Sequence, residues 1–248
     1  MSERPRPRSP RGWVLAGVWV FYLVMWAGGI GSYVFFGGVR AGDEWTAPLF
    51  LTLAGVIVLG SVAAPRAAML VVAGVLGFLA EWIGLRSGDL FGDYRYTDVL
   101  APSLFDVPLV MISAWLVLVA YVDDLLVSLR TRRALRVVGG AALLTAIDLI
   151  IDPLAAGPLG YWTWVSGGAY YGVPAHNFAG WFVVGLIILG LVQLAPSRGP
   201  SSGALWTGVS IVLFFTLLAV ANAMVLPVCV GVMLCVVHGY VRRTAPGS

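Results

Sequence analysis

The 248-residue sequence contains little charge and no lysine. Charged residues make up 11% of the chain, against about 25% in an average soluble domain, whereas 60% of the residues are hydrophobic and the mean hydropathy is +0.92. The composition therefore predicts an integral membrane protein and excludes an ordinary soluble one. All 15 basic residues are arginine and the formal net charge is +3, a small value that argues against nucleic-acid binding.

Histidine and cysteine are also scarce. Two histidines, His176 and His238, are too few for the multi-histidine iron or zinc centres of membrane desaturases, hydroxylases and retinal-forming dioxygenases. Cys229 and Cys235 lie in one apolar segment and are expected to be free thiols. The sequence has neither a glycine-rich phosphate loop nor a nucleophile elbow. We expect no metal and no cofactor.

Long apolar runs dominate the rest of the chain, and a spanning helix needs about 20 such residues. The candidate spans are residues 13–36, 47–64, 67–85, 107–127, 134–155, 177–195, 204–221 and 224–241. The last two form one continuous stretch, too long for a single span, so we expect a turn near Asn222 and Pro227. The prediction is an all-α transmembrane bundle of about eight spans, with seven as the alternative.

The bundle is expected to form a single domain, residues 13–241, between a disordered basic tail, 1–12, and a short C-terminal tail, 242–248. With a cytoplasmic N-terminus, twelve arginines fall in inner segments and only Arg40, Arg86 and Arg95 in outer loops. This distribution follows the positive-inside rule. We therefore expect a multi-pass protein of the cell membrane whose loops 86–106 and 156–176 lie on the non-cytoplasmic side.

Three acidic residues fall inside predicted spans close to that side, namely Glu81, Asp148 and Asp152. Asp148 and Asp152 are one helical turn apart and share a helix face. Carboxylates within a span are costly and mark functional sites by default. The pair has three interpretations: a structural hydrogen-bonded pair, a Mg²⁺ site for a diphosphate, or an acid–base group. Glu81 is either a polar cap or a third member of the site.

Two further groups of acids have other interpretations. Asp123 and Asp124 are expected to pair with the arginine cluster 130–136 near the membrane interface. The loop segment FGDYRYTD, residues 91–98, is either solvated or covers a pocket.

Aromatic and polar residues cluster near the three carboxylates in the predicted topology. Aromatic faces stabilise a desolvated cation by roughly 0.5–2 kcal/mol each, although a membrane-interface belt of tryptophan and tyrosine is the alternative explanation. The candidate substrate-binding residues are Tyr94, Tyr96, Trp115, Trp162, Trp164, Tyr170, Tyr171, His176, Asn177 and Trp181.

The order of these motifs resembles one known family. Glu81 is followed by FGDYRY (91–96), VPLVMISAW (107–115), DLIIDP (148–153), YWTW (161–164) and YYGVPAHNFAGW (170–181). This succession resembles the carotenoid biosynthesis membrane-protein family, of the carotenoid 1,2-hydratase or bisanhydrobacterioruberin hydratase type, over residues 75–182. Its most specific part is YYGVP followed by NFAGW.

The resemblance implies a cofactor-independent hydro-lyase that adds water to the terminal C1–C2 double bond of an acyclic carotenoid end group. The substrate would be lycopene-like or a C50 precursor, and the product a tertiary alcohol. One aspartic acid of the pair Asp148 and Asp152 would protonate the alkene, and the other member or Glu81 would deprotonate the incoming water. The aromatic residues would flank the tertiary carbocation, and Asn177 or His176 would position the water.

Other functions remain open at this point. DLIID also matches the D-x-x-x-D motif of Mg²⁺-dependent membrane prenyltransferases, and a carotenoid or terpene cyclase would share the cation chemistry. A lipid-binding or transport protein is the non-enzymatic alternative. The expected partners are a carotenoid, water and the lipid bilayer, with no nucleic acid; association with other carotenoid-pathway enzymes would suit a substrate that stays in the membrane.

Overall fold

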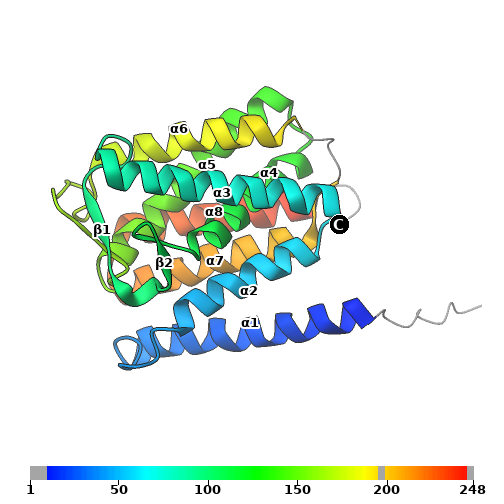
Figure 1. Cartoon of the computed structure of the whole chain (residues 1–248). Coiled ribbons are helices and arrows are strands. Elements are labelled where there is room, and N and C mark those ends of the chain that lie inside the picture. The colour runs from blue at the N-terminus through cyan, green and yellow to red at the C-terminus, as the bar shows by residue number, and fades with distance from the viewer. Residues whose placement is uncertain (1–9, 195–198, 245–248) are drawn as a thin grey trace, which may run out of the picture.

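The computed structural model describes residues 10–194 and 199–244, and within these ranges eight α-helices run alternately up and down (Figure 1). The predicted all-α bundle is confirmed. The helices are α1 (Pro10–Phe35), α2 (Thr46–Gly60), α3 (Ala64–Ser87), α4 (Met111–Ser128), α5 (Arg133–Ala156), α6 (Ala175–Val192), α7 (Ser202–Ala221) and α8 (Val225–Thr244).

Seven of the helices described are long and apolar enough to cross a membrane, and α2, with 15 residues, is the shorter one. The predicted turn within the long C-terminal apolar stretch is confirmed, because α7 ends at Ala221 and α8 begins at Val225. Pro227 lies in the first turn of α8, where a missing backbone N–H is tolerated. Most of the predicted N-terminal tail, residues 1–9, and residues 245–248 of the C-terminal tail lie outside the described residues.

Helix α4 lies at the centre of the bundle and has the largest buried share among the seven long helices. Small residues on its neighbours let it approach closely. Gly77 of α3 lies against the indole of Trp115, and Gly208 of α7 lies against the ring of Tyr121, so that a Cβ atom at either glycine would collide with the ring. Close approach through small residues is typical of helix packing in membranes. Helix α1, in contrast, packs at the edge against α2 and α7 (Figure 1).

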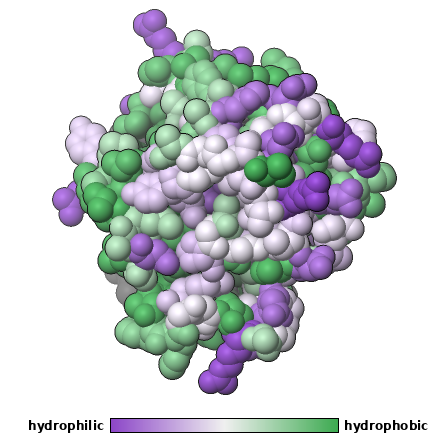
Figure 2. Space-filling model, turned by 90° about the vertical axis from the view of Figure 1, so that its left-hand side faces the viewer, coloured by the Kyte–Doolittle hydropathy of each residue, from purple (hydrophilic) through white to green (hydrophobic). Residues whose placement is uncertain are grey.

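The two ends of the bundle differ in chemistry. At one end, here called the loop end, the long α3–α4 and α5–α6 connections contain β1 (Tyr94–Tyr96), β2 (Ser103–Leu104), β3 (Val107–Pro108), β4 (Trp162–Trp164) and a 3₁₀ turn (Asp98–Leu100). Figure 2 looks onto this end, where hydrophilic residues gather over the middle of the face and hydrophobic residues surround them. These strands were not predicted from the sequence, because they are too short to show a periodic pattern.

At the opposite end, a buried ion cluster joins several helices. Asp123 and Asp124 of α4 pair with the guanidinium group of Arg66 on α3. The predicted pairing with residues 130–136 is therefore wrong, because the carboxylates face the interior of the bundle rather than the membrane interface. Asp123 Oδ1 also accepts a hydrogen bond from Gln193 Nε2 at 2.7 Å, and Asp124 Oδ2 accepts one from the Ser201 backbone N–H at 2.9 Å.

Removing the cation of this cluster should destabilise the bundle. We expect Arg66→Ala to lower the free energy of unfolding by about 3–5 kcal/mol, because two buried carboxylates lose their only guanidinium partner among the described residues. Unfolding in mixed detergent micelles measures this. Arg133→Ala, which removes an exposed arginine at the same end, is the control and should change stability little; equal stability of the two variants would contradict the structural role of the cluster.

Candidate functional site

Three carboxyl groups lie buried in the helix bundle close to the loop end. Glu81 is on α3, and Asp148 and Asp152 are on α5; their exposed fractions are 4%, 1% and 1%. Asp148 and Asp152 share the inner face of α5, as their spacing predicted. The three groups predicted as catalytic are thus all withdrawn from lipid and from solvent.

Asn177, in the first turn of α6, connects the two aspartates. Its Nδ2 atom donates hydrogen bonds to Asp148 Oδ2 at 2.7 Å and to Asp152 Oδ2 at 2.5 Å. Both hydrogens of one amide group are therefore used to hold the acidic pair. Asn177 is itself 2% exposed, so this contact ties α6 to α5 inside the bundle.

A two-stranded ribbon covers the carboxylates from the loop end. Strand β1 pairs with β4 in antiparallel register, with Tyr94 opposite Trp164 and Tyr96 opposite Trp162. Because side chains alternate along a strand, these four aromatic residues share one face, while Arg95 and Thr163 are exposed on the other. The rings contact one another across the ribbon at centroid distances of 5.2 Å for Tyr94–Trp164 and 5.7 Å for Tyr96–Trp162.

The aromatic face of the ribbon donates hydrogen bonds to the carboxylates. Trp162 and Trp164 each direct Nε1 to Asp152 Oδ1, at 2.8 and 3.2 Å. Tyr94 and Tyr96 donate their hydroxyl hydrogens to Glu81 Oε2, at 2.5 and 3.1 Å. One ribbon therefore holds acids from two different helices.

A stacked pair of indole rings lies beside Glu81. Trp115 of α4 donates from Nε1 to Glu81 Oε1 at 3.1 Å. Its ring stacks on Trp181 of α6 with centroids 4.3 Å apart and an interplanar angle of 13°. The predicted residues Trp115 and Trp181 therefore lie together beside Glu81.

The two tyrosines of the ribbon act as neutral donors. Burial, and then the neighbouring Glu81 charge, raises the pKa of Tyr94 and of Tyr96 well above the usual value of a phenol. Both side chains therefore keep their hydroxyl hydrogens throughout the physiological pH range.

A small cavity lies between these groups. Its volume is about 20 Å³, close to the space that one buried water molecule needs, since about 10–15 Å³ suffices. Carboxyl, hydroxyl, amide and indole groups line it together with apolar side chains. The lining residues are Glu81, Phe91, Tyr94, Tyr96, Met111, Asp152, Trp162, Trp164, Asn177 and Trp181.

Five of the predicted site residues do not line this cavity. Trp115 is one of them, although it binds Glu81, which does line it. Asp148 is connected to the cavity through Asn177, which binds it and is itself a lining residue. Tyr170 donates to the Leu149 carbonyl oxygen at 2.8 Å, and burial raises its pKa to about 12. Tyr171 and His176 are exposed on the loop end, so the structure does not bring them to the carboxylates.

Two lining residues, Phe91 and Met111, were not singled out from the sequence. Both belong to the quoted motifs FGDYRY and VPLVMISAW, so the motifs included them although their apolar side chains suggested no chemistry. Phe91 contacts Trp181 at a centroid distance of 6.5 Å.

The donors around the carboxylates bear on metal binding. Asp152 accepts two indole hydrogens and an amide hydrogen, and Glu81 accepts two phenolic hydrogens and an indole hydrogen. Hydrogen-bond donors aimed at a carboxylate suit a bound water or a proton transfer better than a cation, which would have to displace them. In the described ranges, no three acidic, histidine or cysteine side chains are grouped as metal ligands.

Comparison with known proteins agrees with the motifs. The family model described as carotenoid biosynthesis protein matches residues 45–238, which include α3 to α7 and both strands of the ribbon. A bisanhydrobacterioruberin hydratase of Haloarcula japonica is 36% identical over an alignment of 124 residues, which covers 48% of this chain and 41% of that protein. The matched region is thus less than half of the relative's length. No solved structure matches the chain significantly.

The family match covers most of the chain and every residue that lines the cavity beneath the ribbon, so the chain belongs to the family of carotenoid biosynthesis proteins.

Proposed function

We propose that the protein is a carotenoid hydratase that adds water to the terminal C1–C2 double bond of an acyclic carotenoid end group. The observation that carries this proposal is the water-sized cavity bounded by Glu81 and Asp152 beneath an aromatic ribbon. Membership of the carotenoid biosynthesis family and similarity to a protein named a hydratase support it.

Proton donation falls to the aspartate pair. Two neighbouring carboxyl groups in a low-dielectric interior do not both ionise, because like charges repel and neither is solvated. Asp148 and Asp152, held by one amide, would therefore retain a proton, which Asp152 delivers because it lines the cavity. The proton adds to the less substituted carbon, C2, and the alkene's electron pair forms the new C–H bond, leaving a tertiary cation at C1.

The aromatic side chains around the cavity would stabilise this cation. Trp162, Trp164 and Trp181 present indole rings to the cavity, and a desolvated cation gains roughly 0.5–2 kcal/mol from each suitable ring. The cation would also lie next to the Glu81 carboxylate, which lines the same cavity. The aromatic rings and the negative charge of Glu81 would therefore stabilise it together.

Water then completes the reaction. The water molecule in the cavity attacks C1 and forms the C–O bond, and Glu81 accepts its proton, giving the tertiary alcohol. The proton gained by Glu81 must return to the aspartate pair before the next turnover, so the cycle consumes one alkene and one water and no other reactant.

Substrate entry requires the ribbon to move. A branched isoprenoid end group is larger than a cavity of about 20 Å³, so β1 and β4 must shift away from the helices to admit it. The ribbon belongs to two loops rather than to the helices. Its shift would break its hydrogen bonds to Glu81 and Asp152 but would leave the backbone hydrogen bonds of the helices intact.

The competing functions fit this geometry less well. A Mg²⁺-dependent prenyltransferase would need its aspartate oxygens free for the metal, whereas those of Asp152 accept three hydrogen bonds. A carotenoid or terpene cyclase would use the same acid and aromatic rings but would exclude water, whereas this cavity has room for one water molecule.

We also expect the orientation with a cytoplasmic N-terminus in the cell membrane. Arg11, Arg66, Arg133 and Arg243 all lie at the end opposite the ribbon, which places the proposed site in the non-cytoplasmic half of the bilayer. Carotenoid and water would then enter from the membrane and from the non-cytoplasmic side, and association with other carotenoid-pathway enzymes would deliver the substrate.

Expression in cells that make lycopene, followed by mass spectrometry, tests the reaction. The wild-type chain should produce a species heavier than lycopene by one water. Asp152→Asn should lower the yield at least a hundredfold, because an amide cannot donate the proton. Asp148→Asn should lower it as much, because Asp152 without a neighbouring carboxylate would no longer retain the shared proton. Asp89→Asn, at an exposed loop acid, is the control. An isomer of unchanged mass would indicate a cyclase, and five added carbons a prenyltransferase.

Removing the indole donors tests the role of the ribbon. Trp162→Phe and Trp164→Phe keep the aromatic rings but each deletes one hydrogen bond to Asp152. These bonds stabilise the carboxylate that Asp152 becomes as it gives up its proton. A hydrogen bond to a charged group contributes about 1.5–3 kcal/mol, so we expect kcat to fall by about tenfold or more in each variant, with a smaller effect on KM. Thr163→Val, on the outer face of the ribbon, should behave as wild type. Unchanged kcat in both tryptophan variants would show that the ribbon only covers the site.

A further inference from the structure

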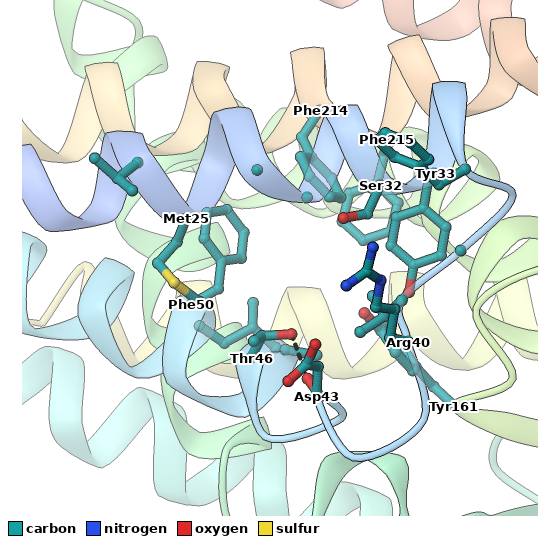
Figure 3. A pocket seen from close by; sticks show the side chains of 18 residues that line it. Met25, Ser32, Tyr33, Arg40, Asp43, Thr46, Phe50, Tyr161, Phe214 and Phe215 are labelled. Carbon is teal, nitrogen blue, oxygen red and sulfur yellow. Dashed lines mark hydrogen bonds between the residues drawn. The ribbon is translucent and has the colours of Figure 1, made fainter.

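A second cavity, of about 450 Å³, lies between α1, α2, α7 and the loop after α1 (Figure 3). Its size falls in the range of small-molecule sites, about 300–1,000 Å³. It lies toward the loop end, like the carboxylates, but the reaction proposed above does not use it.

The cavity is apolar along the helices and polar at its outer edge. Met25, Phe50, Phe214 and Phe215 form the apolar part, and Figure 3 shows their side chains around the open space. The polar residues at the edge are Ser32, Tyr33, Arg40, Asp43, Thr46 and Tyr161. Such a lining suits a long hydrocarbon chain with at most a hydroxyl group at its end.

The charges at the edge argue against a phospholipid. Among the described residues that line the cavity, Arg40 is the one cation and Asp43 the one anion. A phosphate headgroup would therefore meet no net positive charge there. A neutral polyene chain needs none.

Tyr161 connects this cavity to the carboxylate site. Its ring lines the cavity together with that of Tyr33. The next residue, Trp162, binds Asp152. Tyr161 and Trp162, where β4 begins, thus have one side chain in each site. A hydrocarbon chain bound in the second cavity would therefore lie next to the ribbon that must move.

Helix α1 provides an open wall for this cavity. It is the least buried of the seven long helices, and it lies outside the residues matched by the family model, 45–238. Gly28 of α1 lines the cavity and a Cβ atom there would meet no atom within 4 Å. An apolar chain can therefore reach the cavity from the surrounding lipid without displacing a side chain at this position.

We infer that this α1 cavity binds part of the polyene chain of the carotenoid, outside the carboxylate site. The inference rests on the proposed function for the identity of the polyene. Its occupancy, however, is measured by binding and does not depend on turnover.

Filling the cavity at Gly28 tests the inference. Gly28→Phe places a ring in the cavity, whereas Gly17→Phe makes the same change on an exposed part of α1 that does not line it and where a Cβ atom also meets nothing within 4 Å. The full-length proteins are purified from lycopene-producing cells, and retained polyene, hydrated or not, is measured by absorbance per mole of protein. We expect Gly28→Phe to retain at least fivefold less than wild type and Gly17→Phe to retain as much.

Equal polyene retention by the two variants would overturn the inference. It would also be overturned if mass spectrometry of the extract showed that Gly28→Phe loses a bound phospholipid while its polyene retention stays unchanged. Product analysis separates this from the proposed function. If the product is hydrated normally but Gly28→Phe retains as much polyene as wild type, the binding inference is wrong and the proposed hydratase function stands. If Gly28→Phe retains less lycopene but wild type adds no water, the hydratase proposal is wrong and the binding inference stands.

A cysteine reporter covers the case in which Gly28→Phe does not fold. In a background of Cys229→Ala and Cys235→Ala, Gly28→Cys and Gly17→Cys are labelled with a maleimide, with and without lycopene in the micelles. Lycopene should slow labelling at position 28 at least threefold and leave position 17 unaffected. The same rate with and without lycopene at position 28 would contradict the inference.

Discussion

Every other feature of the proposed site depends on the pairing of three buried carboxyl groups with uncharged hydrogen-bond donors. A polar group left unpaired within a membrane protein costs several kcal/mol, and an isolated charge costs more. Glu81 and Asp152 each accept three hydrogen bonds from indole, phenol or amide groups, and Asp148 accepts one from Asn177. None of these bonds comes from a guanidinium group, so the acids are held by neutral donors rather than by a cation. This is what separates them from Asp123 and Asp124 at the other end, whose partner is Arg66.

The sequence predicted the components of the site better than their connections. Helical spacing was enough to place Asp148 and Asp152 on one face, and the density of aromatic residues near them indicated a common location. The pairing of β1 with β4 could not be predicted, because the two strands are three residues each and lie in loops far apart in the chain. The bridging role of Asn177 depends on the rotation of α6 about its axis, and the choice of Arg66 over the arginines at 130–136 depends on which face of α4 is buried. Both are set by packing.

The carboxylate site and the α1 cavity lie on different helices of the bundle. Helices α3 to α6 and their two loops supply all the residues of the carboxylate site, within the part that the family model matches. Helix α1 lies outside that part and packs loosely at the edge, where it leaves an open cavity. The proposed reaction thus lies among the tightly packed helices, and the proposed polyene cavity lies beside a peripheral one.

The most direct test of the central claim is to follow the atoms of water into the product. The purified protein is incubated with lycopene in water labelled with heavy isotopes of both oxygen and hydrogen, and the product is analysed by mass spectrometry. If buried carboxyl groups protonate the alkene and direct water to the cation, the alcohol oxygen and one new carbon-bound hydrogen will both carry the solvent label. An alcohol whose oxygen carries no solvent label would contradict hydration and point to oxygenation instead.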